Sequence, residues 1–205
     1  MMDLMVERIH NYFRSLGLDD EEAASLHMRY YKEYGLAIRG LVQHHAIDPL
    51  DYDQKCDASL PLEEILRPDT RLIHMLKSLK SRKTSVFSLT NAYRVHARRV
   101  LSLLQLDSIV EGIVYCDYTN PAFSCKPEAE FYLAAQEAVH AAPTAQHYFV
   151  DDSIANVRQA IKLGWSKSVH YDEHGDFHEP FTTPDGILTI SHLLQLPTVW
   201  PELFS

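Results

Sequence analysis

Several features are scarce in this chain, and each absence excludes a class of protein. Cysteine occurs only three times in 205 residues, without the paired spacing of a disulfide framework, which suits a reducing compartment. No apolar run approaches the length of a membrane span, and the N-terminus lacks the basic and apolar regions of a secretory signal. Positively charged residues are also few, since the chain has 19 Lys and Arg against 28 Asp and Glu. The resulting net negative charge disfavours nucleic acids and anionic membranes as partners. We therefore expect a cytoplasmic protein that can also reach the nucleus by diffusion.

The chain nevertheless contains enough apolar material for a substantial core. Its residues are 46% hydrophobic and 23% charged, as is usual for a globular protein. Residues 1–67 show helical periodicity throughout, and Asp19 and Glu22 form a candidate capping box. From Pro68 onward, helical and strand patterns alternate. We predict a helical domain over residues 1–67 and an α/β domain over residues 68–205.

The alternating part predicts a parallel sheet with right-handed crossovers. Strands are expected at residues 84–90, 112–116, 146–150, 167–171 and 187–190, and residues 180–186 are expected to form a loop. Helices are expected at residues 69–80, 92–104 and 127–141, and a further one is capped by Ser153 and ends at Gly164. In the helix at 127–141, the predicted inward face consists of Phe131, Ala134, Ala135 and Ala138.

Reactive side chains follow the predicted strands. Thr90 and Asn91 come at the end of one strand, where a hydroxyl, an amide and the backbone N–H groups of a helix start can hold an anion. Lys126 stands before a helix that begins at Pro127, and its compact charge suits a phosphate. Asp151 and Asp152 end another strand, and two adjacent carboxylates call for a cation such as Mg2+.

Each of these signals also has a structural interpretation. A Thr after a strand is commonly a helix cap, a Lys-Pro pair commonly lies at the surface, and the acid pair can itself cap a helix. Their common position is what favours function, because ligands of open α/β sheets bind at the carboxyl ends of the strands. The set therefore predicts metal-assisted chemistry on a phosphate.

The order Thr90, Lys126, Asp151-Asp152 resembles the second, third and fourth motifs of the haloacid dehalogenase (HAD) superfamily of phosphohydrolases. Within that superfamily the chain is similar to the pyrimidine 5′-nucleotidase-like branch. The similar stretches are residues 31–41, 89–92, 115–118, 125–127 and 149–153, together with Asn156.

This resemblance implies a HAD-like Rossmannoid sheet with a helical cap, and a Mg2+-dependent phosphomonoesterase acting on pyrimidine nucleoside 5′-monophosphates or similar small phosphorylated metabolites. Thr90 would bind the phosphoryl group and Lys126 would balance its charge. Asp151 would hold Mg2+, assisted by Asp152.

Three further residues receive secondary roles from the same resemblance. Asn91 and Asn156 would make additional contacts to the substrate. In the cap, Arg39 is the best candidate for substrate selection, and a structural ion pair is the equal alternative. The physiological substrate and the oligomeric state are left open.

The first motif of the family has no match in these residues. That motif is a strand ending in Asp-x-Asp-x-Thr, whose first Asp is the nucleophile. The only Asp-x-Asp is Asp51-Tyr52-Asp53, which follows the turn at Pro49 rather than an apolar strand. Without the carboxylate a phosphoaspartyl mechanism cannot run. The missing strand would also be central, between the strands that end at Thr90 and Asp151.

We therefore expect the 205 residues to be incomplete, either because the sequence is truncated or because another segment or chain fills the gap. The function hypotheses are a phosphohydrolase that is active when the nucleophile is present, and a relic that binds phosphate or Mg2+ without turnover. A receiver-type signalling domain uses similar residues, but its acid pair precedes the Thr and Lys, so we set it aside.

Overall fold

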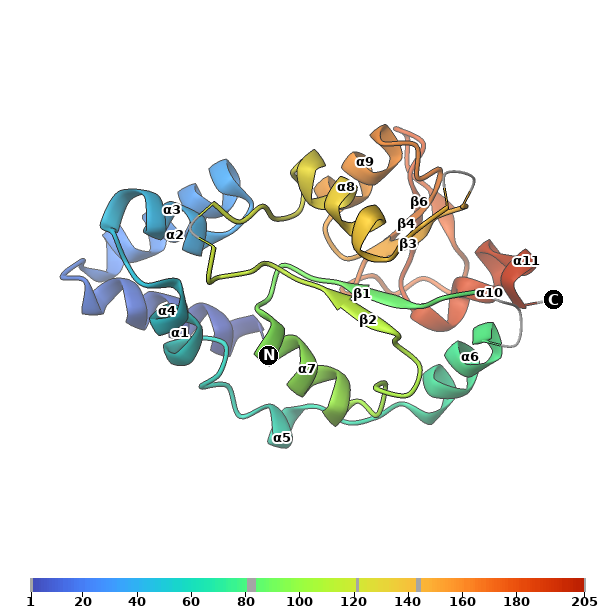
Figure 1. Ribbon diagram of the computed structural model, residues 1–205, viewed down its shortest axis with the longest axis horizontal. Coiled ribbons are helices and arrows are strands. Elements are labelled where there is room, and N and C mark those ends of the chain that lie inside the picture. Colours follow the sequence, from blue (N-terminus) through green and yellow to red (C-terminus); the bar gives the residue numbers. More distant parts are fainter. Residues whose placement is uncertain (1, 81–83, 121, 143–144, 205) are drawn as a thin grey trace. The chain divides into compact units, whose positions relative to one another are not determined.

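The computed structural model describes the chain except for residues 1, 81–83, 121, 143–144 and 205 (Figure 1). The chain divides into two compact units. The helical unit comprises Met1–Pro68, Ser88–Asp107 and Ile113–Cys125, and the sheet unit comprises Asp69–Phe87, Ser108–Gly112 and Lys126–Ser205. These units do not follow a single boundary at residue 67, so the division into cap and core stays a prediction.

The N-terminal part of the helical unit forms helices, as its periodicity predicted. They are α1 (Met2–Ser15), α2 (Asp20–Tyr34), α3 (Ala37–His45), α4 (Pro49–Lys55) and α5 (Leu62–Ile65). The predicted capping box is confirmed, because the Asp19 carboxylate accepts the Glu22 N–H at 2.9 Å and the Glu22 carboxylate accepts the Asp19 N–H at 3.2 Å. Gly35 then ends α2 in the left-handed conformation, with φ of 76°.

Helices α2 and α3 pack against each other, and Gly40 allows a close approach to Tyr30. A Cβ atom on Gly40 would lie 2.1 Å from the Tyr30 ring, so any side chain larger than hydrogen would displace the ring. Tyr30 is buried, and its hydroxyl lies 3.0 Å from Nε2 of His45. Phe13, Ile38 and Leu41 are also buried in this unit, and they supply the apolar core that its helices share.

Among the described residues, the strands fall into two sheets. In the first, β1 (Phe87–Leu89) pairs with β2 (Gly112–Val114), and α7 (Arg94–Leu103) connects them. The second has the order β3-β4-β6-β5, from β3 (Tyr148–Asp151), β4 (Lys167–Tyr171), β6 (Leu188–Ile190) and β5 (Phe181–Thr182). The β3–β4 and β4–β6 pairs are parallel, as predicted, and β5 is antiparallel to β6. The loop expected at 180–186 therefore holds a strand that is too short to show periodicity.

The four-stranded sheet is covered on both faces within its own unit (Figure 1). On one face, Tyr148 and Val150 pack with the buried Val169, Ile190 and Trp200. The helices on that face are α6 (Thr70–Lys80), η1 (Leu193–Gln195), α10 (Leu196–Val199) and α11 (Pro201–Phe204). The other face carries Phe149 and Asp151, and it meets α8 (Ala129–Ala138) and α9 (Ile154–Lys162).

The predicted inward face of α8 is partly wrong. Phe131 and Ala135 are buried as expected, but the third buried residue is Tyr132, which has 0% exposure, while Ala134 and Ala138 are exposed. A tyrosine ring removes far more apolar area from water than two methyl groups, so burial of Tyr132 sets the rotation of the helix.

All three cysteines are buried as free thiols. Among the described residues, no helix is both long and apolar enough to cross a membrane.

Two buried carboxyl groups make the helical unit sensitive to pH. Asp53 and Asp57 are 5% and 7% exposed, and Oδ1 of Asp53 has no hydrogen-bond partner among the described residues. Burial is the main cause that raises the pKa of each group to about 6. For Asp53 the neighbouring Asp57 charge contributes to this rise, and His96 opposes it. His96 lies close by, with Nδ1 at 3.2 Å from the Asp57 carbonyl oxygen, and burial lowers its pKa.

We predict that these two carboxyls lower the unfolding free energy as the pH rises from about 4 to about 6, because the folded state holds protons that the unfolded state releases. Above that range their contribution is constant. The loss is on the order of 3 kcal/mol per carboxyl. Asp53→Asn and Asp57→Asn should each flatten this dependence in urea unfolding followed at several pH values. Glu64→Gln, at an exposed acid, is the control. Parallel curves for wild type and both Asn variants would show that the two carboxyls titrate normally.

Candidate active site

The sheet unit gathers three of the predicted residues around one buried carboxylate. Lys126 Nζ donates to Asp151 Oδ2 at 2.6 Å, and Asn156 Nδ2 donates to Asp151 Oδ1 at 2.8 Å. The Ser153 N–H donates to the same Oδ1 at 2.9 Å. The Lys126 and Asp151 side chains are only 8% and 4% exposed. Both oxygens of Asp151 are thus held in fixed directions.

The local chain path explains why Asp151 occupies this position. It is the last residue of β3, paired in register with His170 of the parallel strand β4, and α9 begins three residues later. Ser153 stands at the N-cap position as predicted, but its hydroxyl makes no capping bond. The Asp151 carboxylate instead closes the turn by accepting the Ser153 N–H, as Asp commonly does with the backbone two residues on.

Lys126 is a buried cation with two kinds of electrostatic support. Its ammonium group contacts the Asp151 carboxylate and lies 5.8 Å from the centre of the Phe149 ring. A buried charge of this kind is tolerated only when it is paired, because desolvation of an isolated ammonium costs several kcal/mol. The positive charge predicted for a phosphate site is therefore already balanced by a carboxylate.

The two adjacent acids differ in environment. Asp151 is buried, whereas Asp152 is exposed, and its backbone carbonyl lies 3.2 Å from Nε2 of His170. In the described part of the chain, no group of three or more His, Cys, Asp or Glu side chains could hold a metal ion by itself. Mg2+ commonly needs less, since one or two carboxylates hold it together with water and substrate phosphate. The donor chemistry of Asp151 and Asp152 fits Mg2+ bound in that manner.

Thr90 and Asn91 belong to the helical unit, where they follow β1. The Thr90 N–H donates to the Val114 carbonyl at 2.9 Å, and Thr90 Oγ1 accepts the Ala92 N–H at 3.1 Å. The Tyr118 hydroxyl donates to the Asn91 carbonyl at 3.2 Å. The Thr90 hydroxyl therefore closes a local turn. It does not cap α7, whose N-cap position is Tyr93, so the helix-cap interpretation of Thr90 is wrong. Phosphate binding by Thr90 and Asn91 stays a prediction.

Arg39 also lies in the helical unit, on α3. Its guanidinium group lies 5.6 Å from the centre of the Phe123 ring, and Nη1 is 3.9 Å from Cys125 Sγ. These contacts connect α3 to the segment that leads into Lys126. Its role in substrate selection stays a prediction.

The structure thus brings together Lys126, Asp151, Asp152 and Asn156 in the sheet unit, and it assigns Thr90, Asn91 and Arg39 to the helical unit. Sequence reasoning missed the roles of three neighbouring residues: Phe149, whose ring contacts the Lys126 ammonium, Tyr132, which bonds the Asn156 backbone, and His170, which lies beside the Asp152 carbonyl. Their signal was present but indistinct, because an aromatic residue on a helix or strand is usually core packing.

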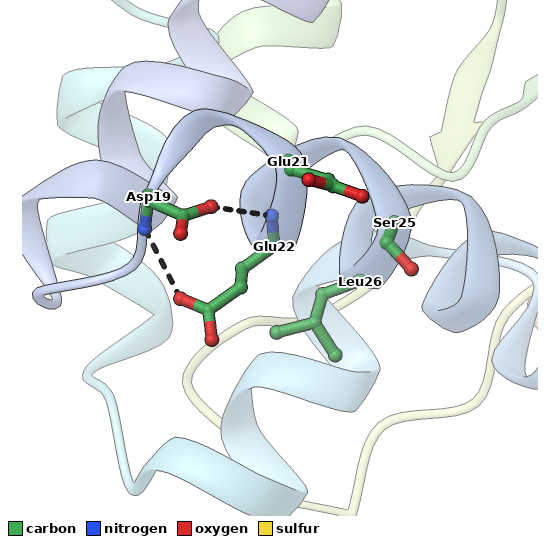
Figure 2. Close-up of a pocket in the computed structure, with 5 residues that line it drawn as sticks. All are labelled: Asp19, Glu21, Glu22, Ser25 and Leu26. Carbon is green, nitrogen blue, oxygen red and sulfur yellow. Dashed lines mark hydrogen bonds between the residues drawn. The ribbon is translucent and has the colours of Figure 1, made fainter.

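A surface hollow of about 360 Å³ lies at the start of α2 (Figure 2). Its lining consists of Asp19, Glu21, Glu22, Ser25 and Leu26, and two of these carboxylates already form the capping box. Three acids would repel an anionic substrate, and none of the predicted site residues lines the hollow. We therefore do not assign the phosphate site to it.

Comparison with known proteins places these residues in a wider context. Residues 4–164 match the family described as hydrolase, haloacid dehalogenase-like hydrolase. The chain is 37% identical over 179 residues to phosphate metabolism protein 8 of Saccharomyces cerevisiae. That alignment covers 83% of this chain but 56% of the yeast protein, so the chain spans about half the length of this relative.

Two solved structures share the fold. A dehalogenase crystallised as an intermediate complex gives a TM-score of 0.55 at 20% identity, covering 82% of this chain and 70% of the other. A putative beta-phosphoglucomutase from Thermotoga maritima gives a TM-score of 0.55 at 16% identity, covering 97% and 88%.

The buried pair should be energetically coupled. We predict that Lys126→Met destabilises the protein by about 3–5 kcal/mol at pH 7, because it leaves Asp151 buried without its countercharge. Asp151→Asn should also destabilise, and the double variant should lose less than the sum of the two. Urea unfolding of all four proteins measures the coupling.

The exposed pair Lys167–Glu202 of the same unit is the matched control, with side chains 39% and 41% exposed. Lys167→Met should cost less than about 1 kcal/mol. Strict additivity of the Lys126 and Asp151 variants would contradict a coupled pair.

Proposed function

Because the chain belongs to the haloacid dehalogenase-like hydrolase family, we propose that its sheet unit carries the metal and phosphate half of a phosphomonoesterase site. The observation that carries this proposal is the buried Lys126–Asp151 pair at the carboxyl end of β3, with Asn156 on the second carboxylate oxygen. A paired ammonium and carboxylate at that edge, next to an exposed acid, provide charges of both signs for a metal-bound phosphate.

Each residue would have a distinct task in this site. Asp151 and Asp152 would hold Mg2+, whose chemistry is to neutralise charge on the phosphoryl oxygens. Lys126 would face the same oxygens as a fixed positive charge. Asn156 would keep Asp151 in one orientation, so that the carboxylate needs no reorganisation when substrate binds. In the helical unit, Thr90 and Asn91 would supply donors to the phosphate.

We propose a pyrimidine nucleoside 5′-monophosphate as the substrate class, with other small phosphorylated metabolites as the wider group. The support is the resemblance of the chain to the nucleotidase branch in its motifs and around Arg39. The name of the yeast relative, phosphate metabolism protein 8, agrees with phosphate chemistry without specifying a substrate.

The nucleophile of such a reaction must be a carboxylate other than those at 51 and 53. Asp51 lies on α4 and is engaged by the Tyr12 hydroxyl at 3.0 Å and by Lys55 Nζ at 2.9 Å. Asp53 is buried beside Asp57. We therefore propose that a segment outside these 205 residues, or another chain, supplies the first motif and the nucleophile.

The test measures phosphate release from UMP and CMP, with AMP and GMP for comparison, in Mg2+ and after chelation. It uses this chain and a form extended by a strand that carries Asp-x-Asp. We expect release only from the extended form, with the pyrimidine nucleotides preferred. Asp151→Asn should lower release by 100-fold or more, because it removes a metal ligand and the countercharge of Lys126.

Asp176→Asn, at an exposed acid of the same unit, is the control and should leave the rate unchanged. Release that survives both chelation and Asp151→Asn would overturn the proposal.

A second function, binding without turnover, is favoured by the local hydrogen bond of the Thr90 hydroxyl to the Ala92 N–H. It predicts that both forms bind inorganic phosphate or Mg2+ and that neither releases phosphate.

A further inference from the structure

We propose that Tyr132 is a positioning residue that braces both members of the Lys126–Asp151 pair. Tyr132 lies on α8 and is 0% exposed. It acts through two neighbours, Asn156 and Phe149. This role rests on the proposed function only where it concerns the binding of Mg2+ at the pair. The positions that Tyr132 imposes on Asn156 and Phe149 do not depend on that function.

The first connection runs through Asn156. The Tyr132 hydroxyl donates to the Asn156 backbone carbonyl at 2.9 Å, and both groups are buried. Asn156 lies in the first turn of α9, and its side-chain amide donates to Asp151 Oδ1 at 2.8 Å. The hydroxyl therefore ties the start of α9 to α8, and the direction of the Asn156 amide depends on that tie.

The second connection runs through the aromatic cluster. The Tyr132 ring meets Phe149 edge-on, with centroids 5.9 Å apart, and meets Trp165 in the same manner at 5.3 Å. Phe149 carries the Lys126 ammonium over its face at 5.8 Å. The ring of Tyr132 thus holds the Phe149 ring, over which the Lys126 ammonium lies. Its hydroxyl holds Asn156, whose amide bonds the other oxygen of the Asp151 carboxylate.

These two functions can be separated by substitution. Tyr132→Phe keeps the ring and its packing but removes the hydroxyl, so it should release the Asn156 amide and leave Phe149 in place. Removing a single buried hydrogen bond of this kind typically changes an equilibrium by about three- to tenfold. The effect should therefore be measurable without loss of the fold.

The matched control is Tyr148→Phe in the same unit. The Tyr148 hydroxyl bonds the side chains of Gln146 and Glu202, at 3.0 and 3.1 Å, and neither belongs to the ion-pair network. Tyr148→Phe therefore removes a tyrosine hydroxyl of the same unit, with exposed bonds and without any connection to Asn156. It shows how far the loss of a hydroxyl elsewhere in the unit moves the signals of the ion-pair network.

The experiment has two readouts. In the metal-free protein, NMR follows the side-chain amide resonances of Asn156 and the ammonium nitrogen of Lys126. Tyr132→Phe should move the Asn156 signals, Tyr148→Phe should leave them in place, and the Lys126 signal should stay put in both. Titration with Mg2+ alone should then show affinity lowered about three- to tenfold in Tyr132→Phe only.

The two proposals fail in different ways. Unmoved Asn156 signals in Tyr132→Phe, or equal shifts in both variants, would overturn the positioning role whatever the Mg2+ result. A wild-type protein that binds no Mg2+ would instead count against the proposed cofactor, while the metal-free spectra would still decide the role of Tyr132.

Discussion

The buried ion pair between Lys126 and Asp151 is the interaction on which the arrangement of the sheet unit depends. A charge with less than a tenth of its surface exposed must find a partner, and each of these two has the other. Asp151 is the last residue of β3, and Lys126 lies just before α8. The pair therefore fixes the position of the segment before α8 relative to the end of β3. The Asn156 amide and the Ser153 N–H then donate hydrogen bonds to the Asp151 carboxylate. These bonds determine the direction in which α9 leaves the sheet.

The same constraint explains why polar and aromatic groups alternate so closely here. A buried pair needs surroundings that exclude water yet satisfy its remaining hydrogen bonds. Phe149 and Trp165 exclude water, and Tyr132 contributes both a ring and a hydroxyl. The helical unit shows the opposite case at Asp53 and Asp57. No ion pair is described for these two buried carboxyls, and His96 only partly opposes the rise in the pKa of Asp53, so both pKa values are raised.

Much of the fold could be predicted because its signals are local. The capping box at Asp19 and the glycine at the end of α2 depend on neighbouring residues. The helix and strand patterns are also local, and their alternation predicted the parallel pairing of β3 with β4. The errors arose where tertiary contacts decide. Burial of Tyr132 rotated α8 away from its alanine face, and β5 formed because β6 offered an open edge. At the site, the motifs located Lys126 and Asp151, but the bonds of Asn156 and Tyr132 depend on how α8 and α9 pack, which no spacing encodes.

Strand β5 also limits how the sheet can associate with other proteins. Exposed edge strands offer unpaired backbone groups that can template a strand from another molecule. Here the edge strand beside β6 is β5, which has only two residues and runs antiparallel to β6. The chain passes from β5 to β6 through a turn at Gly186, where φ is 85°. A strand of this length offers an incoming chain very few unpaired backbone groups for hydrogen bonding. That side of the sheet is therefore protected against edge-to-edge aggregation by shortness rather than by charge.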